Sequence, residues 1–192
     1  FKPLAVHRDN LTLLVDDETI LKEHDIVYFI STKEAIKNIV NFCGKKNILI
    51  EDIMIIGGSK IGVNIAEILE KKFNVTIVEM DRDRCEEIAV NLKKTLVTNI
   101  NGHDVKMLEE EGLSNIDVLI SVTANSEMNI MTSLVGKNHG IKKTIARIEN
   151  LDYINLSQSI GVDTLINKKI IAADEIYKFV IKGNVSSVTN LH

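Results

Sequence analysis

Residues Asp52 to Asp81, DIMIIGGSKIGVNIAEILEKKFNVTIVEMD, carry the pattern that decides the fold. The apolar run from Ile53 to Ile56 is too short for a helix and ends at Gly57-Gly58, so it predicts a buried strand. Apolar residues then recur at spacings of three and four, which predicts an amphipathic helix. A second β-rich run, Val75 to Val78, ends in the acid Glu79. Strand, glycine turn, helix, strand and acid in this order are typical of a dinucleotide-binding βαβ unit.

The glycine turn predicts a phosphate site. A glycine allows the tight turn out of the strand, and a later one lets the helix pack close to the sheet. Unpaired amides and the positive end of the helix dipole attract phosphate, so we expect these amides to point outward. Ser59 occupies the middle fingerprint position in place of glycine, where its hydroxyl can donate a hydrogen bond to phosphate. The cofactor-binding residues expected here are Gly57, Gly58, Ser59, Lys60, Ile61 and Gly62. The alternative is an ordinary strand-to-helix turn.

Glu79 predicts recognition of a ribose. It follows Gly57 by 22 residues, which is near the spacing at which an acid meets ribose hydroxyls, and Met80 lies beside it. A carboxylate accepts hydrogen bonds from these hydroxyls but repels a 2′-phosphate. We therefore expect NAD(H) to bind better than NADP(H). ATP and ADP share the adenosine half of the cofactor and are also candidates.

Composition favours an α/β protein without a nucleic-acid partner. Of the 192 residues 45% are hydrophobic, only 4% are aromatic, and the net charge is −4. The Ile, Val and Leu content suits a parallel sheet covered on both faces. Without a basic excess, nucleic acid is not expected as a partner. Cys43 and Cys85 lack metal-ligand spacing and are typical of reduced thiols in a cytosolic protein. No apolar run predicts a membrane span, so any membrane connection is expected through a partner.

The first 44 residues predict a small β-rich module. Leu4 to Val6, Leu11 to Val15 and Ile26 to Ile30 are short strand patterns separated by polar turns. Ser31 or Thr32 is expected to cap a helix from Lys33 to about Phe42. Gly44 to Asn47 then predicts a linker. These features divide the chain into residues 1–44 and a nucleotide-binding domain over residues 48–192.

After Glu79 the alternation of strands and helices continues. Further strands are expected at Thr95–Ile100, Asp117–Val122, Thr144–Ile148 and Thr164–Ile166. Expected helices run from a cap at Asp81 or Asp83 to Leu92, from a cap at Asp104 to Glu111, from a cap at Ser126 to His139, briefly from Asp152, and over Ile170–Ile181, before an extended tail at Val185–Val188. Six strands in this alternation predict a doubly wound, Rossmann-like parallel sheet. Its ligand should lie beyond the strand carboxyl ends, where the strand order reverses.

Hydrolase and metalloprotease motifs are absent from the sequence. The five histidines are scattered, and neither HExxH nor GxSxG occurs. His103 is the one near a strand end that faces the predicted cleft, and a solvated or capping role is expected for it. We see no second domain large enough to close over a nicotinamide ring, which argues against a dehydrogenase.

Several stretches resemble the cytosolic NAD-binding subunit of Trk-type potassium uptake systems, which is built from regulator-of-potassium-conductance domains. The matching stretches are IMIIGGSKIGVNIAEIL, VTIVEMDRDRCEEIA, DVLISVTANSEMNIMTSLV, IARIENLDYINLSQSIGVD and ADEIYKFVIKGNVSSV. Before them, residues 4–32 look like the later part of the small C-terminal lobe that follows each Rossmann domain in this family. The resemblance covers nearly the whole chain. It implies that the chain runs from the end of one repeat into the Rossmann domain of the next.

The resemblance implies further site residues. Arg82 would lie over the adenine side, and Asn101 near the adenine end, where Ile100-Asn101 replaces the family's common Gly-Asp. Thr123, Asn125 and Glu127 resemble the segment that lines the rest of the nucleotide. Arg147 resembles an arginine near phosphate or the dimer seam. For Arg82 and Arg147 the alternative is an ordinary surface charge, and for Arg147 a simple pair with Glu149.

The resemblance implies a non-enzymatic regulatory subunit that binds NAD(H), ATP or ADP and transmits its occupancy to a membrane potassium transporter or channel. It would be cytoplasmic, peripheral on the inner face of the plasma membrane. The helix at Ile170–Ile181 carries more apolar surface than one sheet face requires, which predicts self-association or packing on another repeat. The alternatives are a small NAD-dependent oxidoreductase and a scaffold repeat whose site has decayed.

Overall fold

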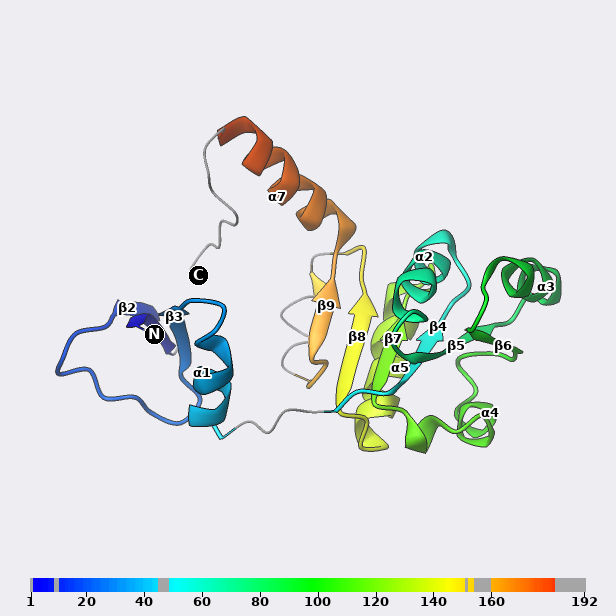
Figure 1. Cartoon of the computed structure of the whole chain (residues 1–192), viewed down its shortest axis with the longest axis horizontal. Helices are drawn as coiled ribbons and strands as arrows, with labels where there is room; N and C mark the ends of the chain where they lie inside the picture. The colour runs from blue at the N-terminus through cyan, green and yellow to red at the C-terminus, as the bar shows by residue number, and fades with distance from the viewer. Residues whose placement is uncertain (1, 9–10, 45–48, 151, 154–159, 182–192) are drawn as a thin grey trace. The chain divides into compact units, whose positions relative to one another are not determined.

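A computed structural model describes residues 2–8, 11–44, 49–150, 152–153 and 160–181 (Figure 1). Contacts divide the chain into two compact units. One comprises Phe1–Ile48 and Asp174–His192, and the other Leu49–Ala173. No helix among the described residues is both long and apolar enough to span a bilayer.

The first unit contains a three-stranded antiparallel sheet. Strands β1 (Lys2–Arg8), β2 (Leu11–Leu14) and β3 (Ile26–Ile30) are ordered β2-β1-β3, which confirms the three predicted runs. The expected start of the following helix is wrong, because α1 spans Ile36–Phe42 and has Ala35 at its N-cap without a side-chain cap. Thr32 instead accepts the amide of Ala35 within a turn that precedes the helix, through its backbone oxygen at 3.1 Å and its Oγ1 at 3.4 Å.

The second unit is built on a six-stranded parallel sheet, as predicted (Figure 1). Its order is β6-β5-β4-β7-β8-β9, so the first strand of the unit, β4, lies between β5 and β7. The order reverses beside β4, and a crevice therefore opens at the carboxyl end of that strand. The strands are β4 (Asp52–Ile56), β5 (Asn74–Glu79), β6 (Leu96–Asn99), β7 (Val118–Ser121), β8 (Lys143–Arg147) and β9 (Thr164–Ile166).

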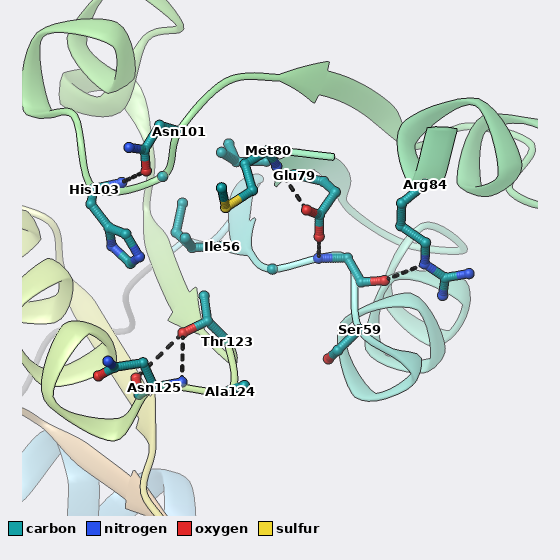
Figure 2. Close-up of a pocket in the computed structure, with 14 residues that line it drawn as sticks. Ile56, Ser59, Glu79, Met80, Arg84, Asn101, His103, Thr123, Ala124 and Asn125 are labelled. Atoms are coloured by element: carbon teal, nitrogen blue, oxygen red, sulfur yellow. Dashed lines mark hydrogen bonds between the residues drawn. The ribbon is translucent and has the colours of Figure 1, made fainter. Parts of the chain in front are cut away.

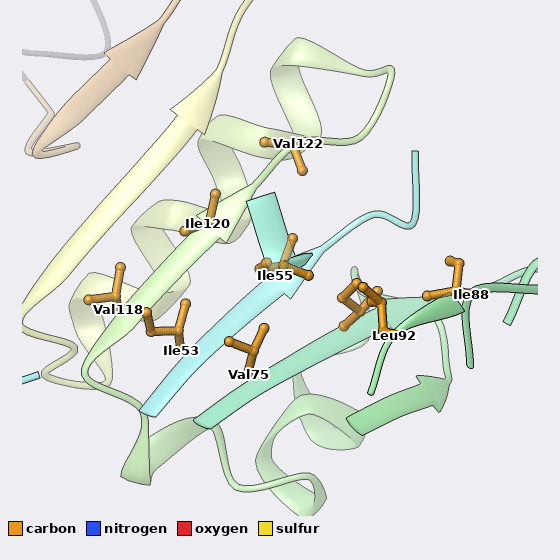
Figure 3. Packing of buried hydrophobic residues seen from close by; sticks show 10 residues of the cluster. Ile53, Ile55, Val75, Ile88, Leu92, Val118, Ile120 and Val122 are labelled. Carbon is orange, nitrogen blue, oxygen red and sulfur yellow. The ribbon is translucent and has the colours of Figure 1, made fainter. Parts of the chain in front are cut away.

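Helices cover both faces of this sheet. Residues Ile53 to Ile56 of β4 point alternately to opposite sides, and because all of them are apolar, each face has to be covered. Ile53 and Ile55 pack with residues of α2 and α3, as Figure 3 shows for Ile88 and Leu92. Met54 and Ile56 pack with Leu108 of α4 on the other face. In chain order, the helices after β4 are α2 (Lys60–Leu69), α3 (Arg82–Asn91), α4 (Val105–Glu110), the 3-10 helix η1 (Leu113–Asn115), α5 (Ser126–Asn138) and α7 (Lys168–Ile181), of which α7 runs across the boundary between the two units.

Two helix caps follow the sequence. Asp81, one of two candidates, caps α3 by accepting the amide of Arg84 at 2.9 Å. Asp104 caps α4 by accepting the amides of Lys106 at 3.1 Å and Met107 at 3.3 Å. Both acids satisfy amides that the first helical turn leaves without a partner.

Two helix starts differ from expectation. The predicted cap of α5 at Ser126 is wrong, since Asn125 accepts the amide of Met128 at 2.9 Å and Ser126 is the first helical residue. α7 begins at Lys168 rather than at Ile170, because Asn167 Oδ1 accepts the amide of Lys169 at 2.8 Å. The tail at Val185–Val188 lies outside the described residues, as do most of the predicted linker and most of the short helix from Asp152.

Candidate functional site

A cavity of about 420 Å³ lies at the carboxyl ends of β4, β5, β6 and β7. The turn after β4, the end of β5 and the loops after β6 and β7 form its walls (Figure 2). This is the place that the reversal of strand order predicts for a ligand. Its volume lies within the range of small-molecule and cofactor sites.

The turn after β4 requires two of its glycines. Gly57 has a φ of +111°, a conformation that side chains rarely adopt, and its amide donates to Val78 O at 2.9 Å. A Cβ atom at Gly62 would lie 2.1 Å from Gly57 O. The turn and the first turn of α2 are therefore in direct backbone contact.

Ser59 fits this turn without strain. Its φ of −61° and ψ of 167° are extended, so the position does not need glycine. Ser59 is the N-cap of α2, where its Oγ accepts the amide of Gly62 at 3.4 Å and donates to Val122 O at 3.4 Å. The serine that departs from the fingerprint thus closes the first turn of α2 and also lines the cavity.

Glu79 lines the cavity but is held by backbone amides. One carboxylate oxygen accepts the amides of Met80 at 2.8 Å and Asp81 at 3.0 Å, and the other accepts the amide of Gly58 at 2.7 Å. The expectation that all amides of the turn point outward is therefore wrong for Gly58. The cause is electrostatic, since the carboxylate lies close enough to satisfy that amide itself. A ligand that binds the Gly58 amide through phosphate, or this carboxylate oxygen through ribose, must first replace the hydrogen bond between Gly58 and Glu79.

The loop after β7 brings Thr123 and Asn125 to the cavity, as predicted from the sequence. Sequence reasoning missed the residue that positions them, Asn129, whose exposed fraction is 1%. Asn129 Oδ1 accepts the Thr123 amide at 3.0 Å and its hydroxyl at 2.6 Å. Its Nδ2 donates to the carbonyls of Thr123 at 3.0 Å and Arg147 at 2.8 Å. The available signal was an asparagine on the buried face of a helix, next to Ile130.

The loop after β6 contributes Asn101 and His103. Asn101 Oδ1 accepts the amide of His103 at 3.0 Å, which fixes the loop at the cavity wall. His103 faces the cavity, as expected: its half-buried imidazole lines the wall, and its Nδ1 is buried without a hydrogen-bond partner among the described residues. Both side chains are drawn at this wall in Figure 2.

Six residues expected in the site do not line the cavity, and one of them is Gly62, which packs against the glycine turn. Lys60 and Ile61 lie in the first turn of α2, and Ile61 faces a separate apolar cavity of about 340 Å³. Arg82 is 82% exposed and pairs with Glu86. The last two of the six are Glu127, which accepts the Tyr153 hydroxyl at 2.9 Å, and Arg147, which also faces the apolar cavity.

Arg147 forms the ion pair with Glu149 that the sequence offered as the alternative to a role in the site. It pairs with Glu149, and its Nη1 donates to Thr123 O at 3.1 Å. Lys168 lies 3.2 Å from the same carboxylate, and these two cations lower the pKa of Glu149, Lys168 more strongly. Arg147 therefore supports the Thr123 loop from behind.

A different arginine reaches the cavity. Arg84 lines it, and its Nε donates to Gly58 O at 2.9 Å while its Nη1 lies 2.5 Å from Glu87. The sequence held a signal for it, since Arg84 lies one helical turn after the Asp81 cap and close to Glu79 in the chain. From the sequence we expected Arg82 in the site instead.

The fold and the cavity define a Rossmann-type domain with a glycine turn and a strand-end acid at the switch point of the sheet. The model of the TrkA-N domain family matches residues 53–168. The chain belongs to this family.

Proteins named as parts of Trk potassium uptake systems match almost the entire chain. A "Trk system potassium uptake protein trkA homolog 1" of Methanosarcina mazei is 29% identical over 189 residues, which are 97% of this chain and 47% of the relative. A "Trk system potassium uptake protein TrkA" of Haemophilus influenzae is 30% identical over 98% of this chain and 41% of its own length. The chain thus spans somewhat less than half of these relatives.

Solved structures share the fold at low sequence identity. The TrkA-N domain of the inner membrane protein ybaL from Escherichia coli aligns with a TM-score of 0.62 at 14% identity, over 69% of this chain and 98% of that domain. The GsuK channel bound to NAD aligns with a TM-score of 0.61 at 18% identity, over 92% of this chain and 31% of the channel chain.

Proposed function

We propose that this chain is the nucleotide-binding part of a regulatory, non-enzymatic subunit of a potassium uptake system. One observation carries the proposal. In a member of the TrkA-N family, the glycine turn, Glu79 and Thr123 converge on one cavity at the switch point of the sheet. This arrangement offers a carboxylate to ribose, amides to phosphate and a threonine loop to the remainder of a nucleotide.

The proposed ligand is NAD(H), with ATP or ADP as further occupants. Glu79 and the glycine turn recognise the adenosine ribose and the phosphates, which all these ligands share. The related fold of GsuK has been solved with NAD and with ADP. We propose Asn101, Thr123 and Asn125 as additional contacts, because they line the same cavity.

The proposed partner is a membrane potassium transporter or channel, with this subunit peripheral on its cytoplasmic side. The names of the relatives support this partner. A bound nucleotide regulates such a partner only if it favours one arrangement of the subunit over another. The cavity groups described above hold a ligand in place, and regulation requires no chemistry on it. Coupling free energies between two sites are typically about 1–3 kcal/mol, which is enough to bias a channel.

Potassium flux tests this function. The full protein is reconstituted with its transporter, and flux is measured with and without NADH or ATP. Wild type should respond to nucleotide, and Glu79→Gln should not, because a neutral carboxamide accepts hydrogen bonds from the ribose hydroxyls more weakly than a carboxylate does. Glu86→Gln, at a 70% exposed carboxylate of α3 outside the cavity, is the matched control and should respond like wild type.

An equal flux for wild type and Glu79→Gln under every nucleotide condition would support the scaffold alternative. Hydride transfer from bound NADH to a panel of carbonyl substrates would instead support the oxidoreductase alternative. The proposed regulatory function predicts no such transfer.

A further inference from the structure

A second cavity, of about 340 Å³, lies on the face of the parallel sheet that α2 and α3 cover. Its walls include Ile65 of α2, Ile120 of β7, Ile145 of β8, Ile166 of β9 and Ile171 of α7. Figure 3 shows Ile120 on this face of β7. Among the described residues, none lines both this cavity and the one at the glycine turn. The two cavities are therefore separate places where a ligand can bind.

The charged residues of this second cavity are both cations. Among the described residues that line it, Arg147 and Lys168 carry polar side chains, and all the others are apolar. Both cations pair with the same carboxylate, that of Glu149. This cluster thus contains one positive charge more than it contains negative charges. An apolar cavity beside a surplus positive charge is complementary to a monoanion with an apolar tail.

Arg147 and Lys168 both have donors left for such an anion. The side chain of Arg147 is 11% exposed, and its Nε is buried without a hydrogen-bond partner among the described residues. A buried N–H without a partner costs free energy, and a carboxylate that draws the guanidinium toward the cavity would give it one. Lys168 is 60% exposed and lies 3.2 Å from Glu149, and its ammonium group carries donors beyond this one pair.

We infer that this cavity binds a medium-chain carboxylate, with the alkyl tail between α2 and the sheet and the head group on Lys168 and Arg147. The volume lies at the lower end of the range of small-molecule sites, so a short alkyl chain fits better than a long one. Burial of the tail supplies most of the affinity. The two cations select a carboxylate over an uncharged head group.

Calorimetry of the protein with octanoate, hexanoate and 1-octanol tests this site. Octanoate should bind about tenfold more tightly than hexanoate, because two further methylene groups leave water. It should bind about threefold more tightly than 1-octanol, which keeps the tail but has no charge. Saturating NADH should not displace octanoate, since the described residues that line the two cavities are different.

Two pairs of variants locate the tail and the head group. Ala172→Phe fills the cavity and should abolish octanoate binding, whereas Ala173→Phe, on the same helix but outside the cavity, should not. Lys168→Met should weaken octanoate binding about threefold and leave 1-octanol binding unchanged, because only the carboxylate interacts with the ammonium group. Lys169→Met, at the neighbouring lysine outside the cavity, is the matched control and should bind both compounds like wild type.

Wild type that does not bind octanoate would overturn the inference, as would displacement of octanoate by NADH or equal effects within either pair of variants. Equal affinities for octanoate and 1-octanol would exclude a carboxylate as the ligand. Octanoate binding that appears only in a Phe179→Glu variant would also overturn the inference, because α7 of a second copy would then be the occupant of the cavity in the wild-type protein.

Discussion

At the scale of single residues, buried polar groups organise the cavity. Asn129 uses its carboxamide for four hydrogen bonds that join α5, the Thr123 loop and the end of β8. Because it is almost fully buried, water cannot replace these partners when the side chain is removed. The position of Thr123 in the cavity therefore depends on a residue that does not line it.

Asn129→Ala should lower the free energy of unfolding by about 2–4 kcal/mol, because the Thr123 amide and the Arg147 carbonyl lose the bonds that Asn129 makes to them in a dry environment, while the Thr123 carbonyl keeps only its bond from Arg147. Urea denaturation measures the change. Asn138→Ala, at the exposed last residue of the same helix, is the matched control and should change stability by less than about 0.5 kcal/mol. Equal stability of the two variants would contradict the role assigned to Asn129.

At the scale of elements, the end of α5 is tied to α4 by a titrating pair. His139, the C-cap of α5, has its Nε2 2.7 Å from Glu109 and its Nδ1 2.9 Å from Val135 O. The hydrogen bond to Glu109 is the main cause that raises the pKa of His139, and the bond to the Val135 carbonyl adds to it. A protonated ring donates through both nitrogens, whereas the neutral ring has only one donor. The negative end of the helix dipole also favours the protonated form.

This pair predicts a pH dependence of stability. A raised folded pKa means that the stabilisation is fully present below the unfolded pKa of histidine and is lost as pH rises through the folded pKa. The free energy of unfolding should therefore fall from pH 6 to pH 8, by no more than about 1 kcal/mol because both side chains are partly solvated. His139→Gln should remove this component. Thermal melts across the range check it, and parallel pH profiles for the two proteins would show that the pair does not contribute.

At the scale of the whole molecule, the described part of α7 leaves a large apolar surface uncovered. Ile176, Phe179 and Val180 are 64%, 80% and 75% exposed. A helix with so much exposed apolar surface is typical of an interface. Self-association remains a prediction.

Light scattering of the protein tests it. We expect an assembly larger than the monomer, and Phe179→Glu should reduce its size because a charge is costly to bury in an apolar contact. Val90→Glu, at an apolar residue of α3 that is 85% exposed, is the matched control and should leave the assembly unchanged. A monomer for wild type at all concentrations, or an equal effect of both substitutions, would exclude α7 as the interface.

The sequence by itself determined the doubly wound sheet and most of its elements. Apolar runs such as Ile53–Ile56 and the helical spacing after Ser59 are local patterns, because a strand repeats every two residues and a helix every 3.6. The glycine turn and Glu79 are also local, since both lie within one βαβ unit. Hence the place of the cavity followed from the chain, as did several of its lining residues.

Only the tertiary structure decided which neighbouring side chains enter the cavity. Arg82 and Arg84 are two residues apart on α3, which places them about 200° apart around the helix axis, and the packing of α3 on the sheet decides which one faces the turn. The Gly58 bond to Glu79 and the bond of Asn129 to the Arg147 carbonyl form only once the elements that carry these residues have packed together. Such contacts depend on how whole elements pack against one another, which the local pattern of residue types does not show.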